Sequence, residues 1–398
     1  MEIINLLFGA IAVAAFAYIG VISIYIGLIT LGAWLTRGKS AHRKATPKVA
    51  IIVPAHNEQD GIGTTLDDLR GLDYPDDACQ VFVIADNCTD RTAQVARSRS
   101  VRVSERKDPQ HRGKGQALDW FVRSHREELE GYELIAFIDA DMRVDAQFLS
   151  AIARSFDDRE TLVVQGRYTI TPDASSWLAA IGFASFAYVN HVRLAGKRFW
   201  GGAATLKGSG MVFRSALILE MGWPAHSITE DIEFGKELLL RGIRVSYEPR
   251  AAVTSNIPST LAQVAVQQSR WEGGNLQVAG RFLVPALKAW LRTPSRAILI
   301  ELLDLLVPPL SLVLLITFAT AVLGVLSQAI PLYLFALPIC AFGAAVVTGL
   351  VHLRAPKKVW LMLLSAPAFA LWKLVLLARV AVGARESEWR RTPRDASR

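Results

Sequence analysis

Three long stretches of the chain contain no charged residue: residues 4–35, 305–326 and 330–350. A helix needs about 20 apolar residues to cross a bilayer. The first stretch is too long for the apolar part of a signal peptide, and no clear cleavage motif follows it. The pattern therefore predicts three membrane helices.

Two further segments are apolar but do not fit a simple span. Residues 359–382 contain Pro367, Lys373 and Arg379, and charges are costly near a bilayer centre. We predict a re-entrant or interfacial segment there, followed by a basic cytoplasmic tail. In residues 281–292 the basic side chains share one helical face and the apolar ones lie opposite, which predicts a helix in the membrane interface.

Basic residues directly after the first span orient the chain. These residues are Arg37, Lys39, Arg43, Lys44 and Lys48, and no acidic residue lies among them. By the positive-inside rule this end is cytoplasmic, so the amino terminus lies outside. We expect an integral protein of a bacterial inner membrane with five segments: an N-terminal transmembrane helix (1–36), a polar cytoplasmic domain (37–280), an interfacial region (281–304), two transmembrane helices (305–353), and a re-entrant or interfacial segment with a basic tail (354–398).

Within the cytoplasmic segment, short buried-type runs alternate with helical patterns. The runs at 49–53, 81–84 and 134–138 are rich in β-branched and apolar residues, and each is followed by polar residues. Helical patterns lie between and after them at 62–70, 89–97 and 116–126. This alternation predicts an α/β fold with a mostly parallel sheet, whose ligands gather at the carboxyl ends of the strands.

The composition favours a membrane protein with a polar domain over a nucleic-acid-binding protein. The 398 residues are 52% hydrophobic and 20% charged, which suits a membrane protein with a polar domain. The net charge of +8 does not indicate nucleic acid, because the basic residues lie beside apolar spans. Anionic membrane lipids and a diphosphate explain it better. Cys79, Cys88 and Cys340 have no zinc-like spacing and predict free thiols.

Asp139-Ala140-Asp141 follows the last of the three buried runs. Two carboxylates at a strand end can hold Mg²⁺ or Mn²⁺, which take oxygen ligands and bridge to phosphates. The alternative is an ordinary strand-end turn, because Asp is common in turns. Alone this motif is a weak signal. Together with Thr229-Glu230-Asp231 and then Gln267-Gln268-Ser269-Arg270-Trp271, in this order along the chain, it becomes a specific one.

This set of motifs resembles family 2 of the membrane glycosyltransferases, which includes the cellulose, hyaluronan and poly-N-acetylglucosamine synthases, with ceramide glucosyltransferase as a relative. The resemblance covers residues 49–271. It implies a GT-A fold and a nucleotide-diphosphate sugar donor, most often UDP-linked. Carried over, it makes Asp86 the base-binding aspartate, Asp139 and Asp141 the DxD pair, Asp231 the base of the TED motif, and Gln267, Arg270 and Trp271 the QxxRW signature. Many members have two aspartates where this chain has Ala85-Asp86.

Each predicted role has a plainer alternative. Asp231 would take the proton from the acceptor hydroxyl, or it could simply favour the start of a helix. Arg270 would pair with phosphate and Trp271 with a sugar, or both could anchor the chain at the interface. The further predicted contacts are Asn57, Glu58 and Lys114 for the donor, and Glu230 and Gly208 for the acceptor.

Three functions remain open from sequence. The first is an inverting, metal-dependent transferase that extends a glycan, such as an extracellular or capsular polysaccharide. The second is transfer of one sugar to a lipid acceptor. The third is a non-catalytic scaffold or transport subunit, which the joint presence of Asp231 and the aspartate pair disfavours.

Overall fold

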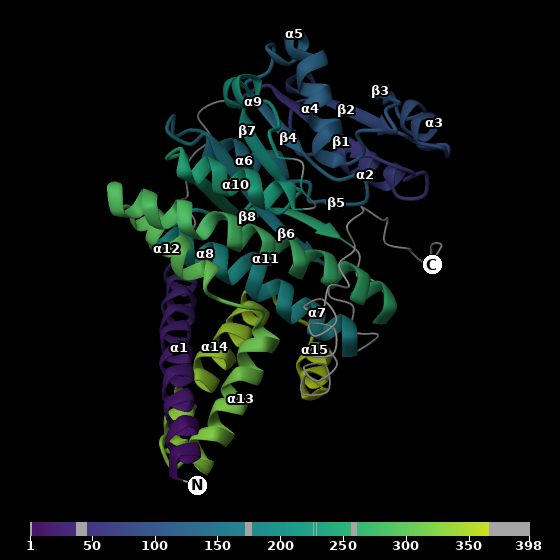
Figure 1. The fold of residues 1–398 in the computed structure, drawn as a ribbon. Helices are drawn as coiled ribbons and strands as arrows, with labels where there is room; N and C mark the ends of the chain where they lie inside the picture. Colours follow the sequence, from purple (N-terminus) through teal and green to yellow (C-terminus); the bar gives the residue numbers. More distant parts are fainter. Residues whose placement is uncertain are drawn as a thin grey trace.

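The fold was analysed in a computed structural model, which describes residues 2–36, 46–171, 177–225, 227, 229–255 and 261–365. A polar α/β domain lies at one end and a bundle of apolar helices at the other (Figure 1). The predicted α/β class is confirmed, and the sheet is mixed rather than purely parallel.

The sheet has eight strands among the described residues, in the order β3-β2-β1-β4-β7-β6-β8-β5. Strands β1 to β4 run parallel to their neighbours in this group, and β7 pairs antiparallel with both β4 and β6. The strands are β1 (Val49–Ala55), β2 (Cys79–Asp86), β3 (Arg102–Arg106), β4 (Leu134–Phe137), β5 (Arg143–Val144), β6 (Val163–Ile170), β7 (Met211–Arg214) and β8 (Val245–Ser255).

Helices cover both faces of this sheet. In the polar domain they are α2 (Ile62–Arg70), α3 (Thr92–Arg97), α4 (Lys114–Ser124), α5 (Arg126–Leu129), α6 (Phe148–Ser155), α8 (Arg193–Phe199), α9 (Ser215–Met221) and α10 (Glu230–Leu240). Toward the apolar end lie α1 (Glu2–Leu35), α7 (Trp177–Ala187), α11 (Leu261–Arg292), α12 (Arg296–Leu305), α13 (Leu310–Leu326), α14 (Ala336–His352) and α15 (Lys357–Met362). The short turns η1 (Asp76–Ala78), η2 (Tyr188–Val192), η3 (Leu332–Phe335) and η4 (Leu363–Ser365) complete the elements.

The two faces of the sheet bury two separate cores. Ala50 and Ile52 of β1 point into one core, whereas Val49, Ile51 and Val53 point into the other. Strands buried on both faces read as continuous apolar runs, which is why β1 was visible in the sequence. The first core continues without a break into Ile22, Ile26 and Ile29 of α1. The polar domain and the apolar helices are therefore one packed body.

Two helical stretches of the described chain are long and apolar enough to cross a membrane, Asn5–Leu35 and Leu332–His352. The remaining predicted span, residues 305–326, does not form one continuous helix. Helix α12 ends at Leu305, and the 17-residue α13 begins only at Leu310. Pro308 and Pro309 cause the break, because proline cannot supply the backbone donor that a helix interior needs.

A cluster of buried charges joins the two ends of the molecule; we call it the junction cluster. Its members are Arg193 and Lys197 of α8, Lys236 of α10, and Glu301 and Asp304 of α12. Lys197 Nζ lies 3.0 Å from a carboxylate oxygen of each acid. Arg193 is 2.6 Å from Asp304, Lys236 pairs with Glu301, and Tyr25 of α1 donates its hydroxyl to Asp304 at 2.7 Å.

Some predicted boundaries were wrong. The helix expected at 89–97 begins at Thr92, because Asp90 accepts hydrogen bonds from the backbone and hydroxyl of Thr92 and ends the preceding turn. The helix expected at 116–126 begins at Lys114 and ends at Ser124. Residues 281–292 form the end of α11, which starts at Leu261, so the expected boundary at 280 falls inside one helix. Residues 37–45 and 366–398, with the basic tail, lie outside the described part.

Helix α8 packs closely on α1 at Gly196. A Cβ atom on Gly196 would lie 2.0 Å from the carbonyl oxygen of Ile29. We expect Gly196→Ala to lower the stability to unfolding by about 1–3 kcal/mol through overpacking. The thermal unfolding midpoint in a mild detergent measures this.

Gly182→Ala in α7 is the matched control, because a Cβ there would meet nothing nearer than Ile170 Cδ1 at 4.0 Å. In a helix this change removes backbone freedom and should be neutral or stabilising. Equal midpoints for Gly196→Ala and Gly182→Ala would contradict the close packing of α8 on α1.

Candidate functional site

The carboxyl ends of β1, β2 and β4 bring the predicted polar segments to one edge of the sheet. Asn57 and Glu58 follow β1, Asp86 ends β2, and Asp139 and Asp141 follow β4. Parallel neighbours with aligned registers must end together, so the sequence prediction of a shared edge is confirmed.

Lys114 connects the parts of the site. Its ammonium group donates to Asp139 Oδ1 and to the carbonyl oxygen of Gly208. A Cβ on Gly208 would lie 3.5 Å from both Lys114 Nζ and Asp231 Oδ2. Gly208 has φ +79°, a conformation that glycine adopts without strain. Four of the predicted residues therefore meet in one place.

Asp231 and Glu230 open helix α10, next to Gly208. The residue before them, Thr229, makes no side-chain capping bond, and the negative charge of these acids favours the start of the helix. Burial raises the pKa of Asp231, and the positive charge of Lys114 opposes that rise. Burial and the neighbouring charge of Asp231 raise the pKa of Glu230. A carboxylate with a raised pKa beside a lysine is suited to accept a proton.

The charge on Lys114 is stabilised by its acidic neighbours. Burial works against the charge, but Asp139, Glu230 and Asp231 outweigh it and raise the pKa of the lysine. Acids thus outnumber bases around Lys114, and such a site favours a further cation. Among the described residues no three acidic, histidine or cysteine side chains are grouped as a complete metal site. Asp139 and Asp141 would supply two oxygen ligands, and a diphosphate would supply others.

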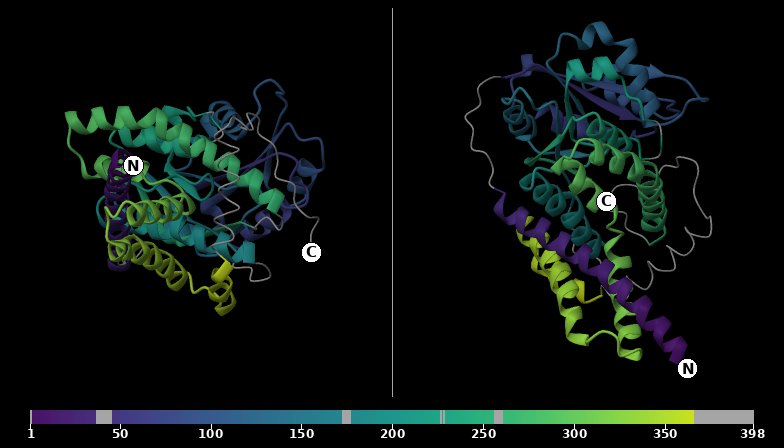
Figure 2. Two further views of the ribbon diagram at one scale, coloured as in Figure 1. Left: turned by 60° about the horizontal axis from the view of Figure 1, so that its bottom comes forward. Right: turned by 60° about the vertical axis from the view of Figure 1, so that its left-hand side comes forward.

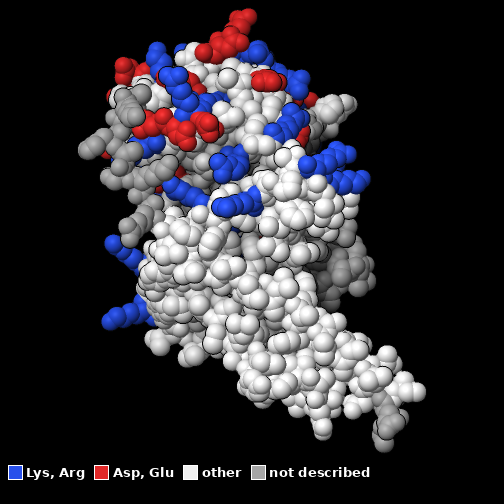
Figure 3. All heavy atoms as spheres, turned by 90° about the vertical axis from the view of Figure 1, so that its left-hand side faces the viewer, with Lys and Arg blue, Asp and Glu red and all other residues white. Residues whose placement is uncertain are grey.

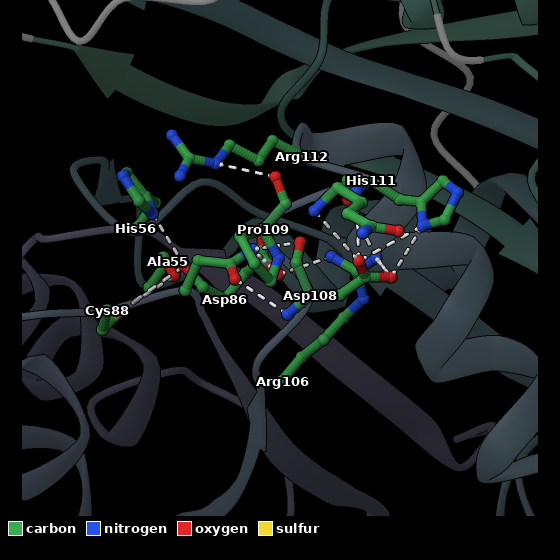
Figure 4. Close-up of polar contacts among 11 residues, drawn as sticks. Ala55, His56, Asp86, Cys88, Arg106, Asp108, Pro109, His111 and Arg112 are labelled. Atoms are coloured by element: carbon green, nitrogen blue, oxygen red, sulfur yellow. Dashed lines mark hydrogen bonds and ion pairs between the residues drawn. The ribbon is translucent and has the colours of Figure 1, made fainter.

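A second group of polar contacts surrounds Asp86 at the end of β2, which is separated from β4 by β1 (Figure 4). Asp86 Oδ1 accepts from Arg106 at 2.6 Å and from the amide of Asn87 at 3.0 Å. Arg106 also donates to Asp108 and to the carbonyl of His111, so it holds the loop that leads to Lys114. Asp86 is 6% exposed. The predicted base-binding aspartate is therefore also part of a buried ion pair.

Asn57 and Glu58 lie between these two groups. Asn57 Oδ1 accepts from the backbone N–H of Thr89 at 2.8 Å, and this bond ties the end of β1 to the loop after β2. A Cβ on Gly61 would lie 3.6 Å from Glu58 Oε2 and 3.8 Å from Asp141 Cα. Glu58 is thus on the Asp141 side of the site, and Asn57 is on the Asp86 side.

Helix α11 passes over the start of α10. A Cβ on Gly274 would lie 2.3 Å from Thr229 Cγ2, so the two helices are in close contact there. Trp271 packs on Phe186 of α7 with ring centroids 5.6 Å apart, and Phe186 packs on Tyr168 of β6 at 5.8 Å. The side chains of Gln267 and Arg270 lie outside the described part.

Sequence reasoning missed two basic residues at the site, Arg106 and Lys207. Arg106 pairs with Asp86 across β2 and β3, and only the register of these strands brings the two together. Lys207 directly precedes Gly208. Its position beside the Gly-Ser-Gly turn could have indicated a residue of the site, but a lysine at that position is equally typical of an ordinary loop.

Comparison with known proteins gives the family. Residues 47–274 match the profile described as "Glycosyltransferase like family 2". The chain is 26% identical over 251 residues to "Probable glycosyltransferase YdaM" of Bacillus subtilis, covering 62% of this chain and 59% of that protein. It is 27% identical over 248 residues to a "Poly-beta-1,6-N-acetyl-D-glucosamine synthase" of Staphylococcus aureus, covering 60% and 57%. The match therefore spans less than two thirds of these relatives.

A solved structure supports the fold over nearly the whole chain. It is "Mannosyltransferase PcManGT from Pyrobaculum calidifontis in complex with GDP-Man and Mn2+", with a TM-score of 0.57 and 18% identity. The superposition covers 94% of this chain and 98% of that one. With the family profile covering more than half of the sequence, the chain belongs to glycosyltransferase-like family 2 and is a glycosyltransferase of GT-A fold.

Proposed function

We propose that this protein is an inverting, metal-dependent glycosyltransferase that works at the cytoplasmic face of a membrane. Its donor is a nucleotide-diphosphate sugar, UDP-linked, and its acceptor is a growing glycan. The observation that carries this proposal is the meeting of Lys114, Asp139 and Asp231 around Gly208. Donor-binding charges and a candidate base share one site at the carboxyl edge of the sheet.

In this mechanism Asp231 takes the proton from an acceptor hydroxyl. The acceptor oxygen attacks the anomeric carbon as the bond from that carbon to the diphosphate oxygen breaks, and the nucleoside diphosphate leaves. One displacement inverts the anomeric centre. Lys114 orients the diphosphate, while Asp86 and Asn57 hold the nucleoside end. When bound by Asp139 and Asp141, Mg²⁺ or Mn²⁺ would neutralise charge on the diphosphate.

Membrane attachment is supported by the surface of the molecule (Figure 3). In that view the acidic side chains are confined to the upper half, most basic side chains gather above the apolar part, a few lie at its left edge, and the rest of the lower half is uncharged. Helices α1, α13 and α14 form this lower part (Figure 2). Basic residues at such a boundary suit anionic lipid headgroups.

The test is a donor screen on the whole chain in lipid nanodiscs. UDP- and GDP-sugars are supplied with Mn²⁺ or Mg²⁺, and nucleotide release and product size are measured. We expect release with one donor class, its loss on adding EDTA, and its return with excess Mn²⁺. Asp139→Asn should weaken Mn²⁺-dependent donor binding, with Asp145→Asn as a control beyond the site. Full activity in EDTA would refute metal dependence, and no release with any donor would refute the transferase.

The mechanism also predicts a pH dependence. Asp231 must be deprotonated, so kcat/KM should fall as the pH drops through its raised pKa. Burial and the charge of Asp231 raise the pKa of Glu230 to about 8, so Glu230 is still protonated and uncharged where Asp231 ionises. Glu230→Gln should therefore leave the acidic limb of the pH profile close to its wild-type position.

Glu233→Gln is the control for this profile. Glu233 lies in the same first turn of α10 but pairs with Arg281 at 2.6 Å, away from the base. We expect its acidic limb to match the wild type. An acidic limb that moves to lower pH in Glu230→Gln would contradict this order of ionisation.

A further inference from the structure

The two carboxylate oxygens of Asp86 have different surroundings (Figure 4). Oδ1 accepts hydrogen bonds from Arg106 Nη1 at 2.6 Å and from Asn87 Nδ2 at 3.0 Å. Within the described residues Oδ2 accepts no hydrogen bond, yet it is not one of the buried polar atoms without a partner. Oδ2 therefore keeps contact with solvent, and a ligand at this strand end can reach it.

The two donors on Oδ1 are held by contacts of their own. Arg106 also donates to Asp108 Oδ2 at 3.0 Å and to the carbonyl oxygen of His111 at 2.8 Å. Asn87 Oδ1 accepts from the backbone N–H of Asp108 at 2.8 Å, so its Nδ2 is the end that donates to Asp86. Arginine has no acceptor, and the amide of Asn87 cannot turn without losing this bond. Both groups next to Oδ1 are therefore fixed as donors.

The backbone of Asp86 is fixed as well. Its carbonyl oxygen lies 2.7 Å from His56 Nδ1, and a carbonyl can only accept, so this nitrogen carries the hydrogen. The backbone N–H of Asn87 donates to the carbonyl oxygen of Arg106 at 2.8 Å, and the pairing of β2 with β3 places Asp86 opposite Arg106. With its backbone and one oxygen held, Asp86 presents Oδ2 in one direction.

A single remaining acceptor distinguishes nucleobases by the polarity of their ring nitrogens. Uracil has one ring N–H, at N3, and this group can donate to Oδ2. Cytosine has a lone pair at the same nitrogen, which a carboxylate oxygen repels. Guanine has two adjacent N–H groups that pair best with both oxygens of a carboxylate, and Oδ1 is already occupied. A site built to bind an N–H strongly rejects an analogue that lacks it.

We infer that Arg106 and Asn87 are positioning residues that select uracil as the donor base, because they occupy Oδ1 of Asp86 and leave Oδ2 for the ring N–H. This inference rests on the proposed function and assigns the choice of its UDP-linked donor to two residues. Neither residue touches the base, since both act through the carboxylate.

The first test measures the binding of nucleoside diphosphates to the whole chain in lipid nanodiscs. UDP, CDP, GDP and N3-methyl-UDP are titrated by calorimetry at saturating Mn²⁺. We expect UDP to bind about tenfold to hundredfold more tightly than each of the others, which is the value of a hydrogen bond to a charged group. Equal affinity for UDP and any of the other three would overturn the inference.

Asp86→Asn then tests the positioning role itself. Arg106 and Asn87 both donate, so the new amide must turn its oxygen toward them and its NH₂ group toward the base. That NH₂ group pairs with N3 of cytosine and opposes the N3–H of uracil. We expect the order of affinities to reverse, with CDP bound more tightly than UDP. Equal affinity for the two would mean that the amide is not held in place, and it would overturn the inference, as would a continued preference for UDP.

Two further variants separate positioning from general damage. Asp108→Asn removes the other acid of Arg106 but keeps both donors on Oδ1, so UDP should still bind more tightly than CDP. Adding Arg106→Met to Asp86→Asn removes the charged donor, and the preference for CDP should shrink severalfold. An unchanged preference in this double variant would overturn the role of Arg106. Each comparison is a ratio of two Kd values for one variant, which does not depend on the folded fraction of the sample.

Nucleotide release from sugar donors in the same nanodiscs keeps the inference and the proposed function apart. Release from a UDP-sugar by the wild type, without the reversal in Asp86→Asn, refutes the inference and leaves the transferase standing. Preferred release from a CDP- or GDP-sugar refutes the inference and the uracil donor, but not the transferase. The absence of release from every nucleotide sugar refutes the proposed function, and the inference with it.

Discussion

Asp231→Asn is expected to lower kcat by about 10²- to 10⁴-fold, the usual contribution of a positioned general base. The amide has nearly the shape of the carboxylate but cannot accept the proton at neutral pH. Asp231 adjoins Gly208 and, through it, Lys114. The donor Kd should change little, because the proposed diphosphate contacts come from Lys114 and from Asp139 and Asp141 after β4. Single-turnover kinetics with the donor from the screen separate the two quantities.

The control for this variant is again Glu233→Gln, which removes a charge from the same helical turn. Its kcat should stay within about threefold of the wild type, since a charge at a helix start is worth only about 0.3–1 kcal/mol. Normal turnover by Asp231→Asn would show that Asp231 is not the general base. A parallel loss of donor binding would assign it to the donor site instead.

Glu301→Gln is expected to destabilise the protein by about 3–5 kcal/mol, because it leaves the buried Lys236 without its acid and Lys197 with only one of its two acids. Glu301 is 3% exposed and pairs with both Lys197 and Lys236. The free energy of unfolding, from denaturant titration in detergent, measures the effect. Glu237→Gln removes an exposed pair with Arg241 on α10 and should cost no more than about 0.5 kcal/mol.

A double variant separates lost charge from lost packing. Lys236→Met with Glu301→Leu replaces the pair by apolar groups of similar size, which in other proteins is neutral or stabilising. We expect it to recover most of the stability lost in Glu301→Gln. If the double variant is as unstable as the single one, packing rather than pairing explains the role of Glu301.

The sequence predicted those features that depend on local pattern. Strand β1 was visible as a buried apolar run, and the edge that carries Asp139 and Asp141 followed from parallel strands ending together. The break before α13 also has a local cause, because Pro308 and Pro309 lie directly before that helix.

Features that depend on distant contacts were not predictable. Arg106 finds Asp86 only because β3 pairs with β2 in one register. Helix α11 runs through Gly273, Gly274 and Pro285, residues that disfavour a helix, and close packing of Gly274 on Thr229 accounts for a small residue there. Glu301 and Asp304 stood out only as acids before an apolar stretch. Their burial needed α8 and α10, which come from elsewhere in the chain.

The junction cluster determines how the protein can be divided. A fragment without α12 would keep Lys197, 1% exposed, and Lys236 in an apolar interior with both of their acids removed. Without α1 it would also uncover Ile22, Ile26 and Ile29 from the core of the sheet. The transferase domain is thus not an independently folding unit. A hybrid that joins it to the membrane helices of a relative would fold only if those helices supplied both carboxylates at matching positions.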